Sequence, residues 1–212
     1  MGRPPLHAMN DYFFSDINTE EKAYWLGFMA ADGSVNKTGI VINLKDIDTN
    51  HLEKFKETIE STVNITIHKN NGFSGGETNI AHFGQWSPIM ANDLFKLGFM
   101  FRKAHMIKPP KIKEHLQRHY WRGVIDGDGS ISKRNLVRIN SGSRKFLLDV
   151  KNLLFSIGIQ SGEIRKEVTS FVLSISEKKN LTKLYNLLYK EAQYYYPRKK
   201  LAWQNNIFKY FR

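Results

Sequence analysis

The chain has 212 residues, of which 41% are hydrophobic and 25% charged, so it is long enough for one large globular domain or two small ones. It contains no Cys, which excludes disulfides and thiolate metal sites. Residues 1–110 hold 11 basic and 12 acidic residues, a net charge of −1, whereas residues 111–212 hold 21 and 8, a net charge of +13. A field of this sign attracts polyanions such as nucleic acids.

Helix and strand patterns alternate along the chain. Asn18 and Glu21 have the spacing of a capping box, which predicts a helix that runs to about Ala31 and ends at Gly33. The rest of the first half is predicted to form strands at 34–37, 39–45, 64–69 and within 77–86, and helices at 48–61 and 88–98. The second half is predicted to form helices at 114–127, 143–157 and 177–192, strands at 130–133, 136–141, 162–168 and 170–176, and a terminal helix at 199–210. Each half therefore has the order αββαββα, which predicts an α+β fold.

The two halves repeat one another in sequence. YWLGFMAADGS at 24–34 matches YWRGVIDGDGS at 120–130, and FRKAHM at 101–106 matches PRKKLA at 197–202, both at an offset of 96 residues. A third echo aligns the segments 40–59 and 136–154. Three echoes in one order predict two copies of one unit, at 1–110 and 111–212, with a basic C-terminal tail on the second.

Small residues and aspartates share the repeated segment. Gly27 and Ala31 lie four residues apart on the first motif helix, as Gly123 and Gly127 do on the second, and small residues at this spacing allow two helix backbones to approach closely. An aspartate follows each pair, Asp32 in one half and Asp128 in the other. If the helices pair, the two carboxylates converge at the negative ends of the helix dipoles, an arrangement that a divalent cation would offset. A supporting role in an Asp-Gly turn is the alternative for either aspartate alone.

The motifs WLGFMAADG and WRGVIDGDG resemble the paired motifs of the LAGLIDADG homing endonucleases, over roughly Thr19 to Asn205. The resemblance implies two pseudo-symmetric αββαββα units packed through their motif helices, whose antiparallel sheets form a DNA-binding saddle. It also implies site-specific, metal-dependent hydrolysis of both strands of a long double-stranded DNA site. One chain holds both units, so a monomer is expected.

The resemblance also assigns candidate site residues. Asp32 and Asp128 correspond to the metal-binding acidic residues, and the metal site is expected to include the preceding Ala31 and Gly127. The expected cofactor is Mg²⁺, with Mn²⁺ as a substitute. The other candidates for catalysis are two basic residues near the end of each unit and two polar residues on the second strand: Lys103, Lys199, Asn43 and Asn140. Lys200 is an alternative to Lys199, and the first motif departs from the second in having Ala30 opposite Asp126, which leaves one fewer carboxylate near the first site.

Outward-facing side chains of the two sheets are the candidates for DNA contact. The first unit offers Lys37, Thr38, Asn43, Lys45, Asn64, Thr66, His68, Asn79 and Gln85. The second offers Lys133, Arg134, Arg138, Asn140, Ser141, Arg144, Arg165, Lys166, Ser174 and Ser176. A solvated sheet face is the alternative, although the second set is markedly basic. The tail residues Arg198, Lys199, Lys200, Lys209 and Arg212 are expected to contact either phosphate or solvent.

A second function remains open on the same fold: a DNA- or RNA-binding protein, either an intron maturase with intron RNA as its partner or a regulator that has lost its nuclease activity. An intein remnant is disfavoured by the lack of Cys. No signal peptide is expected, and no apolar run in the sequence is long enough to cross a membrane. The expected location is intracellular, in a phage or bacterial cytoplasm or in an organelle.

Overall fold

The computed structural model describes residues 8–71, 77–100 and 109–211. The first half consists of α1 (Glu20–Asp32), β1 (Gly33–Asn36), β2 (Gly39–Lys45), η1 (Asp46–Asp48), α2 (Thr49–Thr58), β3 (Thr66–Asn71), β4 (Glu77–Trp86) and α3 (Pro88–Lys96). The second consists of α4 (Glu114–Asp128), β5 (Gly129–Ser132), β6 (Leu136–Ser141), α5 (Arg144–Ser156), β7 (Arg165–Lys166), β8 (Phe171–Ile175) and α6 (Lys178–Tyr189), followed by α7 (Pro197–Asn206) and η2 (Phe208–Phe211).

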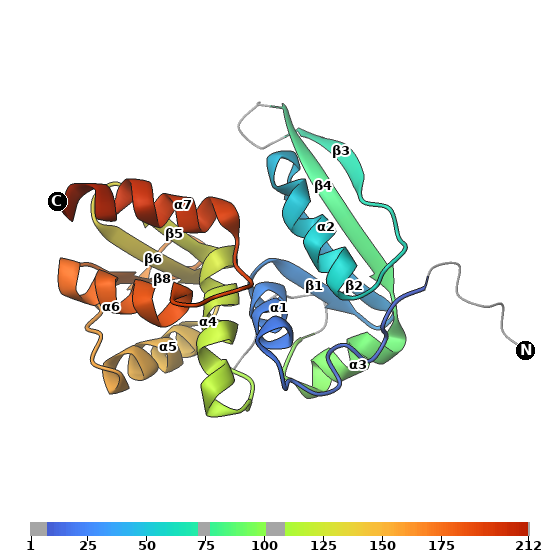
Figure 1. The fold of residues 1–212 in the computed structure, drawn as a ribbon, viewed down its shortest axis with the longest axis horizontal. Coiled ribbons are helices and arrows are strands. Elements are labelled where there is room, and N and C mark those ends of the chain that lie inside the picture. Colours follow the sequence, from blue (N-terminus) through green and yellow to red (C-terminus); the bar gives the residue numbers. More distant parts are fainter. Residues whose placement is uncertain (1–7, 72–76, 101–108, 212) are drawn as a thin grey trace, which may run out of the picture.

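The α+β class and the repeated order αββαββα are confirmed (Figure 1). Two local differences have clear physical reasons. The cap of α1 is Thr19, whose hydroxyl accepts a hydrogen bond from the backbone N–H of Lys22, rather than Asn18. Strand β7 has two residues instead of the expected seven, because only Arg165 and Lys166 pair with β8. The predicted division after residue 110 falls between α3 and α4.

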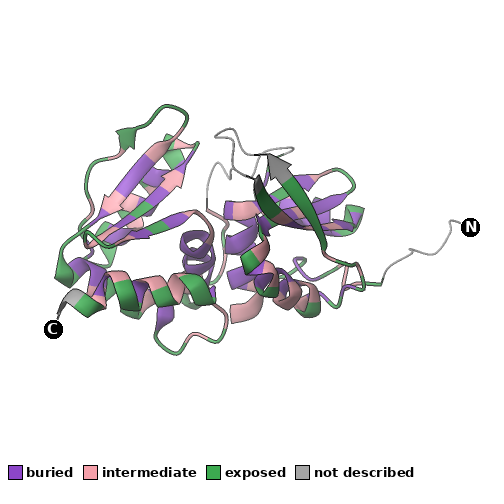
Figure 2. Ribbon diagram, turned by 90° about the horizontal axis from the view of Figure 1, so that it is seen from above, coloured by how far each residue is buried: buried purple, intermediate pink, exposed green. Residues whose placement is uncertain are grey.

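Each half contains one antiparallel four-stranded sheet, with strand order β1-β2-β4-β3 in the first and β5-β6-β8-β7 in the second. The registers correspond: Gly33 lies opposite Ile42 in the first sheet, and Gly129 lies opposite Ile139 in the second. In Figure 2 the strands of both units lie toward one side of the molecule, and most of the helices lie toward the other.

Helices α1 and α4 lie side by side at the centre, with the remainder of each unit on either side (Figure 1). Every residue of α1 from Ala23 to Ala31 is buried, so this helix has no polar face (Figure 2). A helix that is apolar all round belongs in a protein interior. None of the helices in the described part of the chain is both long and apolar enough to cross a membrane.

Candidate active site

The two central helices cross at glycines. A Cβ atom added to Gly27 would lie 1.9 Å from the carbonyl oxygen of Tyr120, and one added to Gly123 would lie 2.1 Å from that of Tyr24. Backbone therefore packs directly on backbone, in both directions, and no side chain fits at either position. One turn later, a Cβ added to Gly127 would lie 2.4 Å from the Cβ of Ala31. The structure thus places all four predicted small residues in the helix contact.

The crossing brings the two aspartates to the same place. Asp32 is the last residue of α1 and Asp128 the last of α4. A Cβ on Gly127, next to Asp128, would lie 3.1 Å from Oδ2 of Asp32. The glycines that follow both aspartates have ordinary negative φ angles, but a Cβ at Gly33 would lie 2.6 Å from the carbonyl oxygen of Met29. Space, rather than a left-handed turn, therefore requires glycine there.

Burial raises the pKa values of both carboxyl groups. Burial raises the pKa of Asp128 to about 8, the negative charge of Asp32 adds to this rise, and Lys199 opposes it. Burial likewise raises the pKa of Asp32 to about 6, with Lys199 and Arg198 opposing. Two half-buried acids that meet in this way favour a cationic third group between them.

Lys199 lies at this junction. Its ammonium donates hydrogen bonds to the carbonyl oxygens of Gly127, at 3.2 Å, and Gly129, on either side of Asp128. Burial lowers the pKa of Lys199, while Asp126, Asp32 and Asp128 act to raise it. Lys200, the one-residue alternative, instead places its ammonium 3.9 Å from the ring centre of Tyr195. Lys103, the candidate in the first unit, lies outside the described residues.

The candidate asparagines occupy equivalent places beside the aspartates. Asp32 precedes Gly33, whose partner across the sheet is Ile42, and Asn43 is the next residue on that strand. The same relation links Asp128 to Asn140 through Gly129 and Ile139. Nδ1 of His82 lies 2.8 Å from Oδ1 of Asn43, so an imidazole N–H donates to the amide oxygen and leaves the amide N–H₂ free to donate elsewhere.

Asp126 is not a further acid at this site. Its side chain is fully buried and accepts hydrogen bonds from the hydroxyl of Tyr189 at 2.5 Å, the hydroxyl of Tyr24 at 3.1 Å, and the backbone N–H of Tyr196 at 2.8 Å. Burial raises its pKa to about 6, and these three donors oppose that rise. The expectation that Ala30 leaves the first site one nearby carboxylate short is therefore corrected, because the carboxylate of Asp126 is committed to internal donors.

Two ion pairs that join the two halves were not predicted from the sequence. Arg122, at the position equivalent to Leu26, is fully buried and places Nη2 2.7 Å from Oε1 of Glu20 at the start of α1. Arg198, whose side chain is half exposed to solvent, also holds Asp48 through contacts of 3.0 Å and 2.8 Å. The substitution of Arg for Leu inside an otherwise repeated motif was the one available signal, whereas nothing in the sequence pairs residues 150 positions apart.

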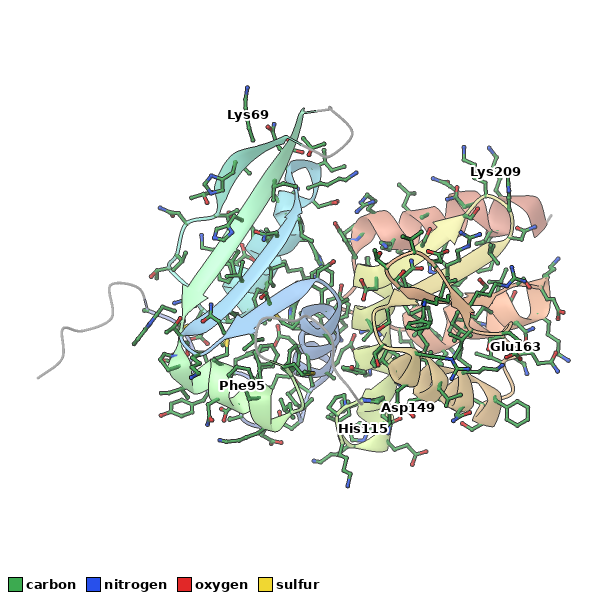
Figure 3. All side chains as sticks on the ribbon, turned by 180° about the vertical axis from the view of Figure 1, so that it is seen from behind. Lys69, Phe95, His115, Asp149, Glu163 and Lys209 are labelled. Carbon is green, nitrogen blue, oxygen red and sulfur yellow. The ribbon has the colours of Figure 1, made fainter. Side chains whose placement is uncertain are left out.

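The exposed face of the first sheet follows from its register. Asn43, His82 and Thr66 lie opposite one another on three adjacent strands. Lys45 and His68 continue the same face, and Lys37 and Thr38 lie in the turn between β1 and β2. Asn64 is exposed just before β3. Figure 3 shows Lys69 at the outer end of this sheet.

The second sheet carries the more basic face. Ser130, Arg138 and Ser174 lie opposite one another, and Asn140 lines up with Arg165 through Val172. Lys133 and Arg134 are exposed in the turn between β5 and β6, and Ser176 is exposed just after β8.

Five predicted DNA-facing residues lie elsewhere. Strand alternation puts Asn79, Gln85, Ser141 and Lys166 on the opposite face of their sheets from the residues above, and Gln85 and Ser141 are buried. Arg144 is not on a strand but is the first residue of α5.

Comparisons with known proteins agree with this architecture. Residues 115–189 match the family model described as a LAGLIDADG-like domain. The replication factor C small subunit of Methanocaldococcus jannaschii is 28% identical over 152 residues, which cover 68% of this chain and 8% of that protein. The chain thus spans only a small part of the length of that relative.

Three solved structures are similar in fold. The homing endonuclease I-WcaI bound to its DNA recognition sequence has a TM-score of 0.62 at 14% identity, covering 88% of this chain and 87% of that one. I-DmoI in complex with DNA and Ca has a TM-score of 0.56 at 14% identity, with coverages of 92% and 99%. The N-terminal LAGLIDADG domain of WhiA has a TM-score of 0.53 at 13% identity, with coverages of 91% and 92%. At these identities the likeness shows the fold alone. The predicted resemblance is confirmed: the chain contains a LAGLIDADG-like domain at 115–189 and, as a whole, has the two-unit LAGLIDADG fold of single-chain homing endonucleases.

Proposed function

We propose that this protein is a site-specific, divalent-metal-dependent endonuclease that hydrolyses one phosphodiester bond on each strand of a long double-stranded DNA site. The observation that carries the proposal is the meeting of Asp32 and Asp128 at the ends of the two central helices. Neither carboxylate stabilises the metal-free fold there, because burial opposes ionisation of both and the charge of Asp32 further opposes ionisation of Asp128.

The donor set fits Mg²⁺, with Mn²⁺ as a substitute. Carboxylate and backbone carbonyl oxygens are hard ligands, and Mg²⁺ is commonly held by one or two carboxylates with water in the remaining positions. Asp32 and Asp128 would hold the ion, together with the Ala31 and Gly127 backbone. The carbonyl of Gly127 already accepts one hydrogen bond from Lys199, which leaves it one lone pair. When bound, the ion supplies positive charge that activates water and stabilises a leaving oxygen.

The other residues act through their own donors. Lys199 places an ammonium group beside Asp128, where its charge acts on both acids and stabilises negative charge that develops on phosphate oxygens. Asn43 and Asn140, on the strands beside the two aspartates, hold water in line with the scissile bonds through their amide groups. Lys103 is proposed for the same role as Lys199 in the first unit.

DNA lies along the exposed faces of both sheets. Side chains on alternate positions of adjacent strands can contact base edges in the major groove, and the basic face of the second sheet adds phosphate contacts. The two units in one chain supply both halves of the contact, so the active form is a monomer.

A second candidate function is DNA binding without cleavage, which the similarity in fold to WhiA favours. The test is a supercoiled plasmid library that carries randomised inserts, incubated with the protein in Mg²⁺, Mn²⁺ or EDTA. The endonuclease yields linear products of defined sequence with either metal and none in EDTA. Retention of DNA in a binding assay without any linear product identifies the second candidate instead, and activity in an intron-splicing assay would identify a maturase.

A further inference from the structure

The segment that carries Lys199 is fastened to the central helices by charged side chains. Between α6 and α7, the backbone N–H groups of Gln193 and Tyr194 donate to Oε1 of Glu20, at 2.9 Å and 3.3 Å. Arg122 donates from Nε to the carbonyl oxygen of Tyr194 at 2.6 Å. These contacts hold the middle of the connection against α1 and α4.

Asp126 fastens the end of that connection, where α7 begins. Its Oδ2 accepts the backbone N–H of Tyr196 at 2.8 Å, and Pro197 follows as the first residue of α7. The carbonyl oxygen of Tyr196 in turn accepts the backbone N–H of Lys199 at 3.0 Å. The carboxylate is therefore linked to the backbone of the first turn of α7 through a single residue, Tyr196.

That first turn determines where Lys199 points. Because proline fixes its own φ angle, the direction of α7 is set by the residue that precedes Pro197. Downstream, Asn206 anchors α7 along β5 by donating to the carbonyl oxygen of Ile131 at 2.9 Å. Between these two attachments, the Lys199 ammonium reaches the carbonyl oxygens beside Asp128.

We propose that Asp126 is a positioning residue: it holds Tyr196, and through it the first turn of α7, so that the Lys199 ammonium stays on the carbonyl oxygens of Gly127 and Gly129, beside Asp128. This rests on the proposed endonuclease function only for its effect on catalysis. The first unit cannot use the same device, because Ala30 stands at the equivalent position and has no side-chain acceptor. Asp126, the acid that distinguishes the second motif from the first, therefore positions Lys199 and does not bind the metal.

The experiment measures the reactivity of Lys199 toward an amine-acylating reagent at fixed pH, by peptide mass spectrometry of the full-length protein without metal or DNA. All variants are made in a Lys200→Arg background, so that acylation at this pair of adjacent residues can occur only on Lys199. Asp126→Ala is expected to increase the acylation rate of Lys199 roughly tenfold or more, because the ammonium is released from a half-buried position. Asp126→Asn removes the same negative charge but keeps one acceptor oxygen for the N–H of Tyr196, so it measures the effect of charge alone. The acylation rate in Asp126→Ala is expected to exceed the rate in Asp126→Asn severalfold.

Tyr189→Phe is the matched control. It removes a hydrogen bond to the same carboxylate but leaves the bond to Tyr196, so the Lys199 rate is expected to remain near that of the wild type. Equal acylation rates in folded Asp126→Ala and Asp126→Asn overturn the proposal, because the whole effect would then come from the lost charge. An equal rise in Tyr189→Phe also overturns it, because that result would indicate general loosening.

If Asp126→Ala does not fold, a second pair of variants tests the same hydrogen bond from the side of its donor, the backbone N–H of Tyr196. Tyr196→Pro removes the N–H donor, and Tyr196→Ala removes the same side chain while keeping the donor. The backbone of Tyr196, with φ of −85°, lies close to the range of proline. Faster acylation in the Pro variant than in the Ala variant supports the proposal, and equal rates overturn it.

Cleavage assays separate this inference from the proposed function. If the wild type cleaves DNA, Asp126→Ala is expected to lower kcat roughly tenfold or more with little change in DNA affinity, as expected for a misplaced group at the reacting centre. If the wild type cleaves nothing but the acylation rates behave as described, the positioning role stands and the endonuclease proposal fails alone.

Discussion

The two halves of the molecule share an order of elements but divide their chemistry unequally. In α1 the motif positions on either side of the glycine, from Leu26 to Ala31, are apolar, whereas in α4 the equivalents of Leu26 and Ala30 are the buried Arg122 and Asp126. The repeated residues, glycine and aspartate, are those that the helix crossing and the site require. The divergent ones fasten the C-terminal segment, which carries Lys199. Internal duplication has thus preserved the shared centre and freed the positions around it.

The largest expected effect tests whether the two halves contribute one aspartate each to a shared site for metal-dependent DNA cleavage. Asp32→Asn and Asp128→Asn each keep the size of the side chain but remove the charge that would hold the metal. We expect each to lower Mg²⁺-dependent cleavage by roughly 10³-fold or more, with DNA affinity nearly unchanged. A gel-based cleavage assay and a separate binding titration measure the two quantities. Full activity in either variant would contradict the paired site.

The helix crossing predicts the next largest effect. Gly27→Ala and Gly123→Ala place a methyl group about 2 Å from a carbonyl oxygen of the other helix, so the helices must separate. We expect a loss of about 2–4 kcal/mol in the free energy of unfolding, measured by urea titration. Gly162→Ala is the control, since its Cβ would meet its nearest neighbour at 3.5 Å, and it should change stability little. Equal, small effects at all three positions would argue against direct backbone packing.

The carboxyl pair predicts a gain of stability on neutralisation. The pKa of Asp128 in the folded chain, about 8, lies above its usual value of 3.8, so the folded state holds more protons between these pH values and the metal-free protein loses stability as pH rises from about 4 to 8. Asp128→Asn removes this loss. At about 1.4 kcal/mol per pH unit, reduced for local water, we expect the variant to be about 1–3 kcal/mol more stable than the wild type at pH 8.

Thermal unfolding in EDTA across this pH range measures the gain. Added Mg²⁺ should stabilise the wild type and leave Asp128→Asn unchanged. A variant less stable than the wild type at every pH would show that the carboxylate supports the fold.

The smallest expected effect concerns the difference in charge between the exposed faces of the two sheets, measured by the salt dependence of DNA binding. Arg138→Ser in the second sheet removes a cation from the predicted DNA face, and Asn43→Ser alters the first sheet without changing its charge. If Arg138 contacts phosphate, its loss should weaken binding severalfold and reduce the slope of log affinity against log salt by about 1. Asn43→Ser should leave the salt slope unaltered. Identical slopes for wild type and Arg138→Ser would place that arginine away from phosphate.

Much of this architecture could be predicted because it is repeated locally. Strands β2 and β6 have the predicted bounds, since alternation and flanking turn residues specify short strands. The small residues of α1 and α4 predicted their pairing, because small residues on matched faces let two helix backbones approach closely. The weak edge strand β7 was overestimated, because sequence alternation does not reveal how many residues find a partner.

The network behind the site could not be predicted in the same way. Asp126 looks like one more carboxylate near the site in the sequence, since it lies two residues before Asp128. Only the fold brings Tyr24, Tyr189 and Tyr196 to it, from three separate elements. The pairing of Arg198 with Asp48 has the same origin, because it depends on how the two halves meet.

The most direct test of the central claim is an NMR titration of the Asp128 carboxyl group in metal-free protein, for the wild type and Asp32→Asn. If the two acids meet as described, the pKa of Asp128 is raised in the wild type and falls in Asp32→Asn, while burial keeps it above 3.8. An identical pKa in both proteins would show that the carboxylates do not interact, and the shared site would have to be abandoned.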